Sequence, residues 1–305
     1  MPLSARAQAN LDFIALCWIW GSTWLAIKIG LTNVPPATSA AIRFVIAGVL
    51  LFGIVLATRA KLPRSAHFSW LVAGQGAQLA INYYLIYWAE QTVPSGLTAV
   101  LFAVFPIFTS AIAALIFRIE RFGPVNVLGL ALGVAGLCII FWSEVLLAAR
   151  TSWLGMTAVV LSALVAAFGT TTMKRWGHEF PPLAVAAPSQ LACGVLLAGF
   201  ALVVDRTRAI AFTPVAIGSI AYLAVFGSAV AFVSYYRLLR IVSATRAALL
   251  TYVTPIVAVV LGAVVAHETI GLRTLAGAAL VFASIGLVHV PPEQMPERSP
   301  ADPEV

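Results

Sequence analysis

Charged residues are scarce in this chain. Asp, Glu, Lys and Arg make up 10% of the 305 residues, whereas hydrophobic residues make up 61%, and the mean hydropathy is +0.99. A soluble domain carries about 25% charged residues. No single soluble core could bury this much apolar surface, so the composition predicts a chain whose solvent is lipid.

Cysteine, histidine and acidic residues are also few, and none of them forms a cluster. The three cysteines, Cys17, Cys138 and Cys193, lie in apolar runs without a Cys-x-x-Cys pair, which indicates small buried hydrophobes. All 11 acidic residues and all four His lie at the ends of apolar runs, in loops or in the tail. The sequence therefore offers no catalytic cluster, metal site or cofactor site, and no proton relay in mid-membrane.

Ten apolar runs cover most of the chain, and each has the roughly 20 residues that a helix needs to cross a bilayer. They span residues 11–31, 37–58, 68–89, 96–117, 124–144, 153–173, 183–204, 214–236, 246–266 and 272–290. Segment 1–10 precedes them, and the Pro- and charge-rich tail 291–305 is expected to be disordered. The sequence thus predicts an all-α integral membrane protein with ten transmembrane helices.

Lys and Arg are distributed unevenly between alternate loops. Four lie in odd-numbered loops, two (Lys28 and Arg43) lie within runs, and the other twelve lie at the start, in even-numbered loops or in the tail: Arg6, Arg59, Lys61, Arg64, Arg118, Arg121, Lys174, Arg175, Arg237, Arg240, Arg246 and Arg298. Cytoplasmic loops carry the excess of Lys and Arg. We therefore expect both termini and the even-numbered loops to be cytoplasmic. The net charge of +7 is then a topology signal, and no nucleic-acid partner is expected.

The first half of the chain recurs in the second. AGVLLFG at 47–53 returns as CGVLLAG at 193–199, an offset of 146 residues. Further matches follow in order: Lys28 with Lys174 and Gly48 with Gly194 at offset 146, Tyr87 with Tyr236 and Pro106 with Pro255 at 149, Glu120 with Glu268 and Gly129 with Gly277 at 148. Because each half holds five runs, an odd number, the repeats 11–145 and 150–290 are expected to have inverted topology, which many secondary transporters share.

Longer stretches carry a family resemblance. WGSTWLAIKIG at 20–30, AAIRFVIAGVLL at 40–51 and the ends of both halves, 105–141 and 254–290, resemble the EamA-like metabolite exporters of the drug/metabolite transporter superfamily. Within that branch the pattern is most similar to aromatic amino acid exporters. The resemblance implies ten helices around a central cavity and export of amino acids or similar small metabolites. The second half departs at AHETIG, where the family often has Gly-Glu-Arg, so a shared role for that Arg stays open.

Polar and aromatic residues at mid-span are the candidates for lining a solute cavity, because lipid cannot satisfy polar groups. Gln75, Gln78 and Asn82 recur at i, i+3 and i+7 and form one helical stripe, for which helix–helix hydrogen bonding is the alternative. The predicted cavity-lining set is Trp20, Thr23, Trp24, Gln75, Gln78, Asn82, Tyr83, Tyr87, Phe102, Phe168, Ser228 and Tyr252.

Three further pairs of residues have predicted roles. Pro106 and Pro255 should kink their helices, either as hinges or gates for alternating access or as packing features. Lys28 and Arg43 either snorkel to the outer interface or bind a substrate carboxylate at the outer rim. Glu120 and Glu268 are expected to cap, to pair with a cation or to close a gate.

These features predict a secondary transporter, not an enzyme, in the inner membrane. It is expected to export aromatic and other neutral amino acids such as Thr or Met, or related metabolites, by alternating access. The alternative is an exchanger of phosphorylated solutes, of the sugar-phosphate or nucleotide-sugar type, which would need Lys or Arg deep in the cavity. A membrane-embedded enzyme and a structural or receptor-like protein are less compatible with the repeat. The expected partners are the solute and the bilayer; the oligomeric state stays open, and a monomer is compatible.

Overall fold

The computed structural model describes residues 4–121, 123–147, 152–265 and 271–288. Every regular element in these ranges is helical, which confirms the all-α prediction for them. The predicted disorder of the tail and the prediction for Glu268 lie outside these residues. The elements are α1 (Ala5–Gly30), α2 (Pro36–Ala57), α3 (Ala66–Ala89), α4 (Ser95–Phe102), α5 (Phe105–Ala111), η1 (Ile112–Ile116), α6 (Pro124–Ile140), α7 (Trp142–Leu147), α8 (Trp153–Trp176), α9 (Pro182–Val204), α10 (Pro214–Tyr222), η3 (Leu223–Val230), α11 (Ala231–Ile241), α12 (Ala244–Ala248), α13 (Leu250–Val265) and α14 (Leu272–Leu287).

Six helices in the described ranges are long and apolar enough to cross a membrane, counting consecutive helical segments together. Several predicted boundaries differ from the structure, among them those of α1 and α6. α1 begins six residues before the predicted start, because the Ser4 hydroxyl accepts a hydrogen bond from the Ala7 amide at 3.2 Å and caps the helix. α6 ends at Ile140, and the short helix α7 continues the segment that was predicted as one span to residue 144.

The two prolines that were predicted to kink their helices act differently. Pro106 lies in the first turn of α5, and the helical path is broken before it, between α4 and α5. Pro255 lies inside the continuous helix α13, where it deprives the Thr251 carbonyl of its helical N–H donor. The Thr254 hydroxyl donates to that carbonyl at 3.3 Å instead. The first proline therefore interrupts its helix, whereas the second is accommodated within it.

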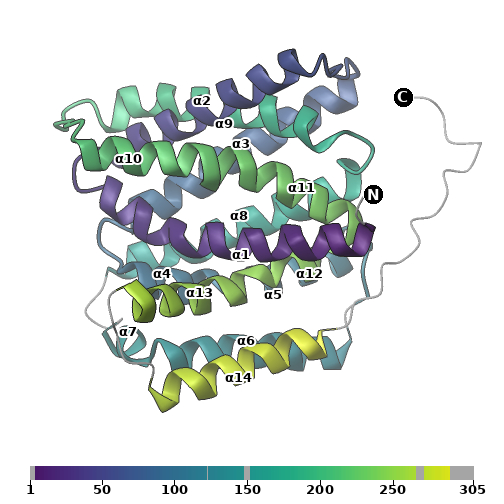
Figure 1. The fold of residues 1–305 in the computed structure, drawn as a ribbon, viewed down its shortest axis with the longest axis vertical. Coiled ribbons are helices and arrows are strands. Elements are labelled where there is room, and N and C mark those ends of the chain that lie inside the picture. The colour runs from purple at the N-terminus through teal and green to yellow at the C-terminus, as the bar shows by residue number, and fades with distance from the viewer. Residues whose placement is uncertain (1–3, 122, 148–151, 266–270, 289–305) are drawn as a thin grey trace, which may run out of the picture.

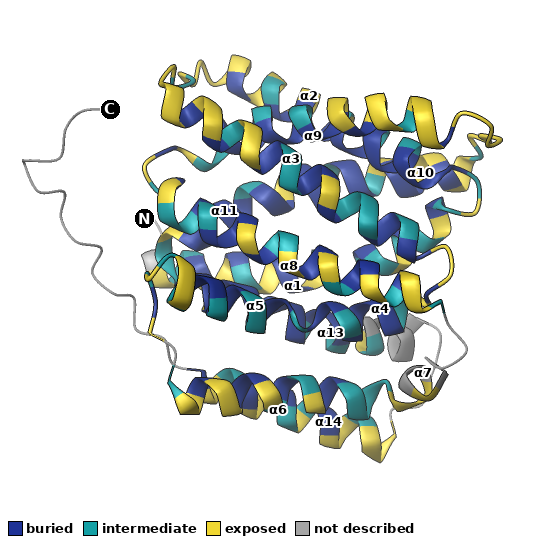
Figure 2. Ribbon diagram, turned by 180° about the vertical axis from the view of Figure 1, so that it is seen from behind, coloured by how far each residue is buried: buried dark blue, intermediate teal, exposed yellow. Residues whose placement is uncertain are grey.

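The long helices run side by side across the long axis of the molecule (Figure 1). α2 and α9 lie together at one end of this axis, and α6 and α14 lie together at the other. Their buried faces point toward the interior, whereas exposed residues concentrate on the outer faces (Figure 2). Many of these exposed residues are large and apolar, including Leu56, Trp70 and Leu202. Such an apolar exterior suits contact with lipid.

Glycines let the paired helices at each end approach closely. A Cβ atom on Gly48 would lie 2.7 Å from the Leu191 amide nitrogen, and one on Gly194 would lie 2.6 Å from the Val45 amide nitrogen. The two contacts are equivalent under the sequence offset of 146, since Val45 corresponds to Leu191. Between α6 and α14, Gly129 contacts Val288 and Gly277 contacts Ile140, and these contacts are equivalent under the offset of 148. Each helix pair is thus built from reciprocal contacts.

Candidate solute-binding cavity

A cavity lies between α1, α3, α4, α5, α8, α11 and α13, and the empty space there amounts to about 770 Å³ when the adjoining open solvent is included. Its lining is mainly aromatic and weakly polar: the rings of Trp20, Trp24, Tyr83, Phe102, Phe105, Phe232, Tyr235 and Tyr236, the amides of Gln75, Gln78 and Asn82, the hydroxyls of Thr23, Thr170, Thr251 and Thr254, and aliphatic Ile27, Leu79, Ile86, Ala166 and Leu250. None of these lining residues is charged.

Eight of the twelve predicted residues line this cavity: Trp20, Thr23, Trp24, Gln75, Gln78, Asn82, Tyr83 and Phe102. Five of the twelve lining residues that were missed are equivalent, in the sequence repeat, to predicted residues: Ala166, Thr170, Phe232, Tyr236 and Thr251. Six pairs of lining residues are equivalent at the offsets 146 or 149: Trp20 with Ala166, Trp24 with Thr170, Tyr83 with Phe232, Ile86 with Tyr235, Phe102 with Thr251, and Phe105 with Thr254. Both halves therefore line the cavity with equivalent helix faces.

Four predicted residues lie outside the cavity lining. Phe168 is 48% exposed on the outer face of α8, because Ala166 and Thr170 of the same helix turn the opposite face inward. Tyr252 is buried against α6, where its hydroxyl donates to the Leu130 carbonyl at 2.9 Å. Tyr87 and Ser228 are buried partners of the Arg43 guanidinium. Periodicity did not indicate which neighbour these side chains contact.

The polar residues on α3 have two different roles: Gln75 bonds to neighbouring helices, whereas Gln78 and Asn82 each present an acceptor without a donor in the part of the chain that the structure describes. Gln75 is engaged in helix–helix bonding, since its amide donates to the Gly169 carbonyl at 3.0 Å and its carbonyl accepts from the Tyr236 hydroxyl at 3.3 Å. Gln78 donates to Gln75 at 3.2 Å, which leaves its own Oε1 without a donor among the described residues. Asn82 Oδ1 also lacks one. Two buried acceptors in the lining are therefore available to a solute that carries hydrogen-bond donors.

Aromatic contacts hold the walls of the cavity in place. Trp20 packs against Tyr235 and Phe232 with ring centroids 5.1 and 5.6 Å apart, and Trp24 packs edge-on against Phe102 at 5.5 Å. The Trp20 indole donates to the Gly227 carbonyl at 3.2 Å. Gly227 belongs to the π-helical segment η3, in which the wider helical turn changes the usual carbonyl pairing.

Arg43 differs from both of its predicted roles. It has no exposed surface, so it does not snorkel, and it does not line the cavity. Its guanidinium donates to Ser228 at 2.7 Å, to the Gly227 carbonyl at 3.1 Å and to Tyr87 at 3.2 Å. It also stacks behind the cavity residue Tyr83, with its Cζ 4.6 Å from the ring centroid. Arg43 thus supports one cavity wall from behind.

Lys28 is also absent from the lining. Its ammonium donates to the Glu90 backbone carbonyl and so joins the ends of α1 and α3. We call this end of the bundle, where α1 finishes, the distal end, and the end where α1 begins the proximal end.

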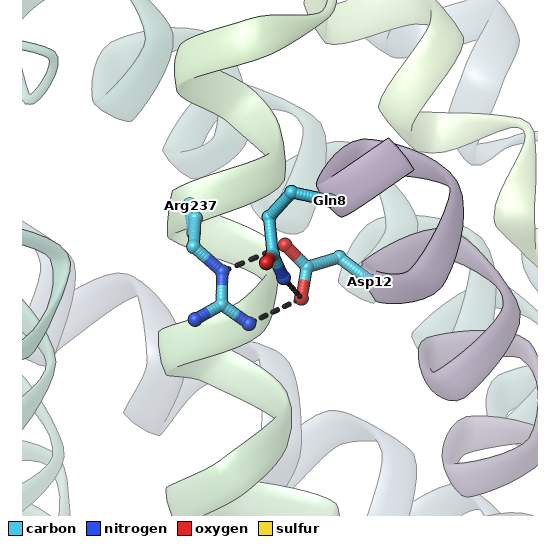
Figure 3. Close-up of polar contacts among 3 residues, drawn as sticks. All are labelled: Gln8, Asp12 and Arg237. Atoms are coloured by element: carbon cyan, nitrogen blue, oxygen red, sulfur yellow. Dashed lines mark hydrogen bonds and ion pairs between the residues drawn. The ribbon is translucent and has the colours of Figure 1, made fainter. Parts of the chain in front are cut away.

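Polar contacts join separate helices at the proximal end. Asp12 of α1 accepts two hydrogen bonds from Arg237 of α11, and Gln8 donates to the same carboxylate (Figure 3). The buried Glu120 carboxylate accepts from the Ala244 and Thr245 amides and so caps α12. Burial raises the pKa of Glu120, whereas these hydrogen bonds lower it. The capping role expected for Glu120 is present in this arrangement.

We expect Asp12→Asn to loosen the proximal end. The ion pair is partly solvated, since the Arg237 side chain is 44% exposed, and such pairs contribute about 0.5–1 kcal/mol. Spin labels attached at Arg6→Cys and Arg240→Cys should therefore report more of a longer-distance population in pulsed electron paramagnetic resonance. Gln8→Ala, which spares the ion pair, is the control. Identical distance distributions for Asp12→Asn and Gln8→Ala would contradict a closing role for the pair.

Comparisons with known proteins agree with this architecture. A solved structure described only as "Crystal structure of protein" matches with a TM-score of 0.73 at 19% identity and covers 92% of this chain and 96% of its own. The inner membrane transporter YedA of Escherichia coli K12, itself described as uncharacterized, is 32% identical over 273 residues, which cover 89% of this chain and 87% of YedA. The uncharacterized transporter YoaV of Bacillus subtilis is 26% identical over 284 residues, 91% and 95% of the two chains. The family model for EamA-like transporters matches residues 9–142 and again 153–290. The chain therefore belongs to the EamA-like transporter family.

Proposed function

We propose that this transporter exports neutral amino acids, with aromatic and apolar side chains preferred, by alternating access of the central cavity. The observation that carries the proposal is the lining itself: eight aromatic rings, no charged side chain, and two buried amide oxygens without a donor. The rings suit an apolar side chain. Gln78 and Asn82 can accept hydrogen bonds from an ammonium group, and the lining hydroxyls can donate to a carboxylate.

Phosphorylated solutes fit this lining less well. Lys and Arg side chains are favoured partners of a phosphate group, because they supply charge-assisted hydrogen bonds. Lys28 and Arg43, the two basic residues within the predicted apolar runs, are committed to a backbone carbonyl and to three buried acceptors, respectively. The exchange of sugar phosphates or nucleotide sugars is therefore the second candidate.

The inverted repeat supports alternating access. We propose that residues 11–145 and 150–290 form two five-helix halves of opposite orientation. The double match of the family model, the reciprocal glycine contacts and the six equivalent pairs of lining residues all support this. Two such halves can exchange conformations and so open one midplane cavity to either side. The break before Pro106 and the turn between α12 and α13 are the proposed flexing points.

We propose a cytoplasmic location for the proximal end, which carries the amino terminus. The excess of Lys and Arg in the loops of that end supports this orientation. An inner-membrane location is supported by the name of the relative YedA. The solute would then leave the cell through the distal end.

The proposed function is tested by transport into proteoliposomes that contain the purified full-length chain. One radiolabelled neutral amino acid, such as Phe, is offered alone and then in competition with aliphatic, charged and phosphorylated solutes. We expect aromatic and aliphatic amino acids to compete and phosphorylated solutes not to compete. Movement no faster than in protein-free liposomes for Phe, Met and Thr would overturn the assignment. Competition by sugar phosphates alone would favour the second candidate.

Asn82→Leu should lower amino acid transport at subsaturating concentration by about tenfold or more. The substitution keeps the side-chain size and removes an acceptor for the ammonium group, and a hydrogen bond to a charged group contributes about 1.5–3 kcal/mol. Ile81→Leu changes the neighbouring residue, which is 52% exposed, and serves as the control. Equal initial rates for the two variants would rule out solute recognition by Asn82.

A further inference from the structure

Glu90 follows the last residue of α3 and is completely buried at the distal end of the bundle. No described residue donates a hydrogen bond to either of its carboxylate oxygens. An ionised carboxylate in such a place loses its hydration without compensation, at a cost of several kcal/mol. The surroundings therefore favour the neutral, protonated carboxyl group. The sequence pattern, which located every acidic residue at the end of an apolar run, in a loop or in the tail, gave no indication of this burial.

Three titratable or charged groups act on Glu90: Lys28 of α1, Arg43 of α2 and Tyr87 of α3, the helix that ends at Glu90. Lys28 donates to the Glu90 backbone carbonyl, and Arg43 bonds to Ser228, Gly227 and Tyr87. Neither cation is hydrogen-bonded to the carboxyl group. Burial raises the pKa of Glu90 well above its ordinary value, although Lys28 and Arg43 act in the opposite direction.

A raised pKa has a defined consequence here. The carboxyl holds its proton at a pH at which a solvated glutamate, with a pKa of about 4.3, is ionised. Exposure to water returns the pKa toward that ordinary value. At a pH between the ordinary and the raised pKa, the carboxyl therefore releases its proton when it becomes exposed. Any movement that separates α1 from α3 at the distal end therefore converts a neutral group into a charged one.

The opposite end of the bundle lacks this arrangement. Lys174, the repeat equivalent of Lys28, donates to the carbonyl of Leu239, which is equivalent to Glu90 at offset 149. Arg43 is equivalent to Ser189 at offset 146. The hydrogen bond from the lysine to a backbone carbonyl thus does not require a carboxyl side chain, because the residue that supplies the carbonyl at the proximal end is Leu239. Lys174 also acts on a buried acid, Glu120, but the Ala244 and Thr245 amides donate to that carboxylate, whereas no described residue donates to the Glu90 carboxyl. Among the described residues, a buried acid without a donor near a buried guanidinium therefore distinguishes the distal end.

We propose that the Glu90 carboxyl is a proton-binding site of the distal end that couples solute movement to proton movement. It carries a proton while α1 and α3 are bridged and releases that proton to the distal side when this end opens. The step is a simple dissociation of the carboxylic acid into a carboxylate and a proton. Water that enters the opened end then solvates the carboxylate. The coupling rests on the proposed transport function, whereas the proton site is independent of which solute is carried.

The proton site is tested on the purified full-length chain by infrared difference spectroscopy during a pH titration. We expect a protonated carboxylic acid band near neutral pH in the unmodified protein, and we expect Glu90→Gln to remove it. Asp205→Asn is the matched control, because Asp205 is a buried carboxylate of the same end that accepts hydrogen bonds from the Thr38 amide at 2.8 Å and hydroxyl at 3.0 Å. Absence of the band, or its persistence in Glu90→Gln, would overturn the proposal.

The coupling is tested in proteoliposomes under an imposed pH gradient. We expect the gradient to accelerate Phe movement several-fold for the unmodified chain and for Asp205→Asn, and to have no effect on Glu90→Gln. The double variant Arg43→Ser, Glu90→Leu carries the residues of the other half, removes the acid together with the guanidinium and should also be insensitive. Unchanged sensitivity in both variants would overturn the coupling. A carboxylic acid band without amino acid transport would retain the proton site and reject the proposed substrates, whereas transport without the band would do the reverse.

Discussion

Gly48→Ala and Gly194→Ala should each lower the thermal stability of the transporter, although alanine is the better helix former. Each added Cβ would lie within 2.8 Å of backbone atoms on the facing helix, and a backbone cannot rotate away as a side chain can. The two helices must move apart, and overpacking of this kind costs about 1–3 kcal/mol. This exceeds the gain of about 1 kcal/mol from replacing glycine in a helix.

The same two helices provide the matched controls. Gly53 and Gly199 are equivalent to one another at offset 146, and a Cβ added to either has no neighbour within 4 Å. Gly53→Ala and Gly199→Ala should therefore leave the melting temperature unchanged or raise it. Thermal unfolding of the four variants in detergent, followed by size-exclusion chromatography, measures the difference. Equal melting temperatures for Gly48→Ala and Gly53→Ala would show that the contact between α2 and α9 is looser than described.

Arg43→Met should produce the second large loss of stability, of about 3 kcal/mol or more, because hydrogen bonds to a charged group contribute about 1.5–3 kcal/mol each and their sum is only partly realised. The guanidinium joins α2 to Tyr87 of α3 and to Gly227 and Ser228 of η3, so one side chain connects both halves. Methionine fills much of the volume but leaves these buried groups without their donor. Tyr83 also loses the cation behind its ring.

Two further variants separate this effect from a loss of charge. Arg43→Lys keeps the positive charge but lacks the planar fork that reaches three acceptors, so it should remain markedly destabilised. Lys61→Met removes an exposed cation, and substitutions at such positions change the stability by about 0.5 kcal/mol or less. Melting temperatures in the same detergent compare all three. A value for Arg43→Met equal to that for Lys61→Met would mean that the buried contacts contribute nothing.

Much of the architecture could be predicted from the sequence because hydropathy and helix length are local properties. The runs of apolar residues coincide with helices or with series of consecutive helices, and eight predicted residues line the cavity. The interruption of these helices was harder to predict. The π-helical segment η3, which presents the Gly227 carbonyl to Trp20 and Arg43, has no marker in its sequence LAVFGSAV.

The remaining differences arise from tertiary contacts that sequence depth does not encode. Arg43 lies about two turns into its helix, a depth that allows snorkelling, yet its helix turns it toward the other half of the chain. Glu90 lies at a helix end, where a carboxylate is normally solvated, yet it is fully buried. Tyr252 has the correct depth for the cavity but contacts α6 instead. In each case the neighbouring helix decides the role, and that neighbour is distant in sequence.

The two glycine contacts also have a mechanical meaning. The pair α2 and α9 and the pair α6 and α14 lie at opposite ends of the long axis, and each joins one half of the chain to the other (Figure 1). If the two proposed halves move as rigid bodies, the close contacts in these two helix pairs favour rotation about the line that joins the pairs. Helices close to the line then move little, and helices far from it sweep the widest arcs. The two proposed halves would thus rotate about an axis through these two helix pairs, and the cavity lies between the pairs.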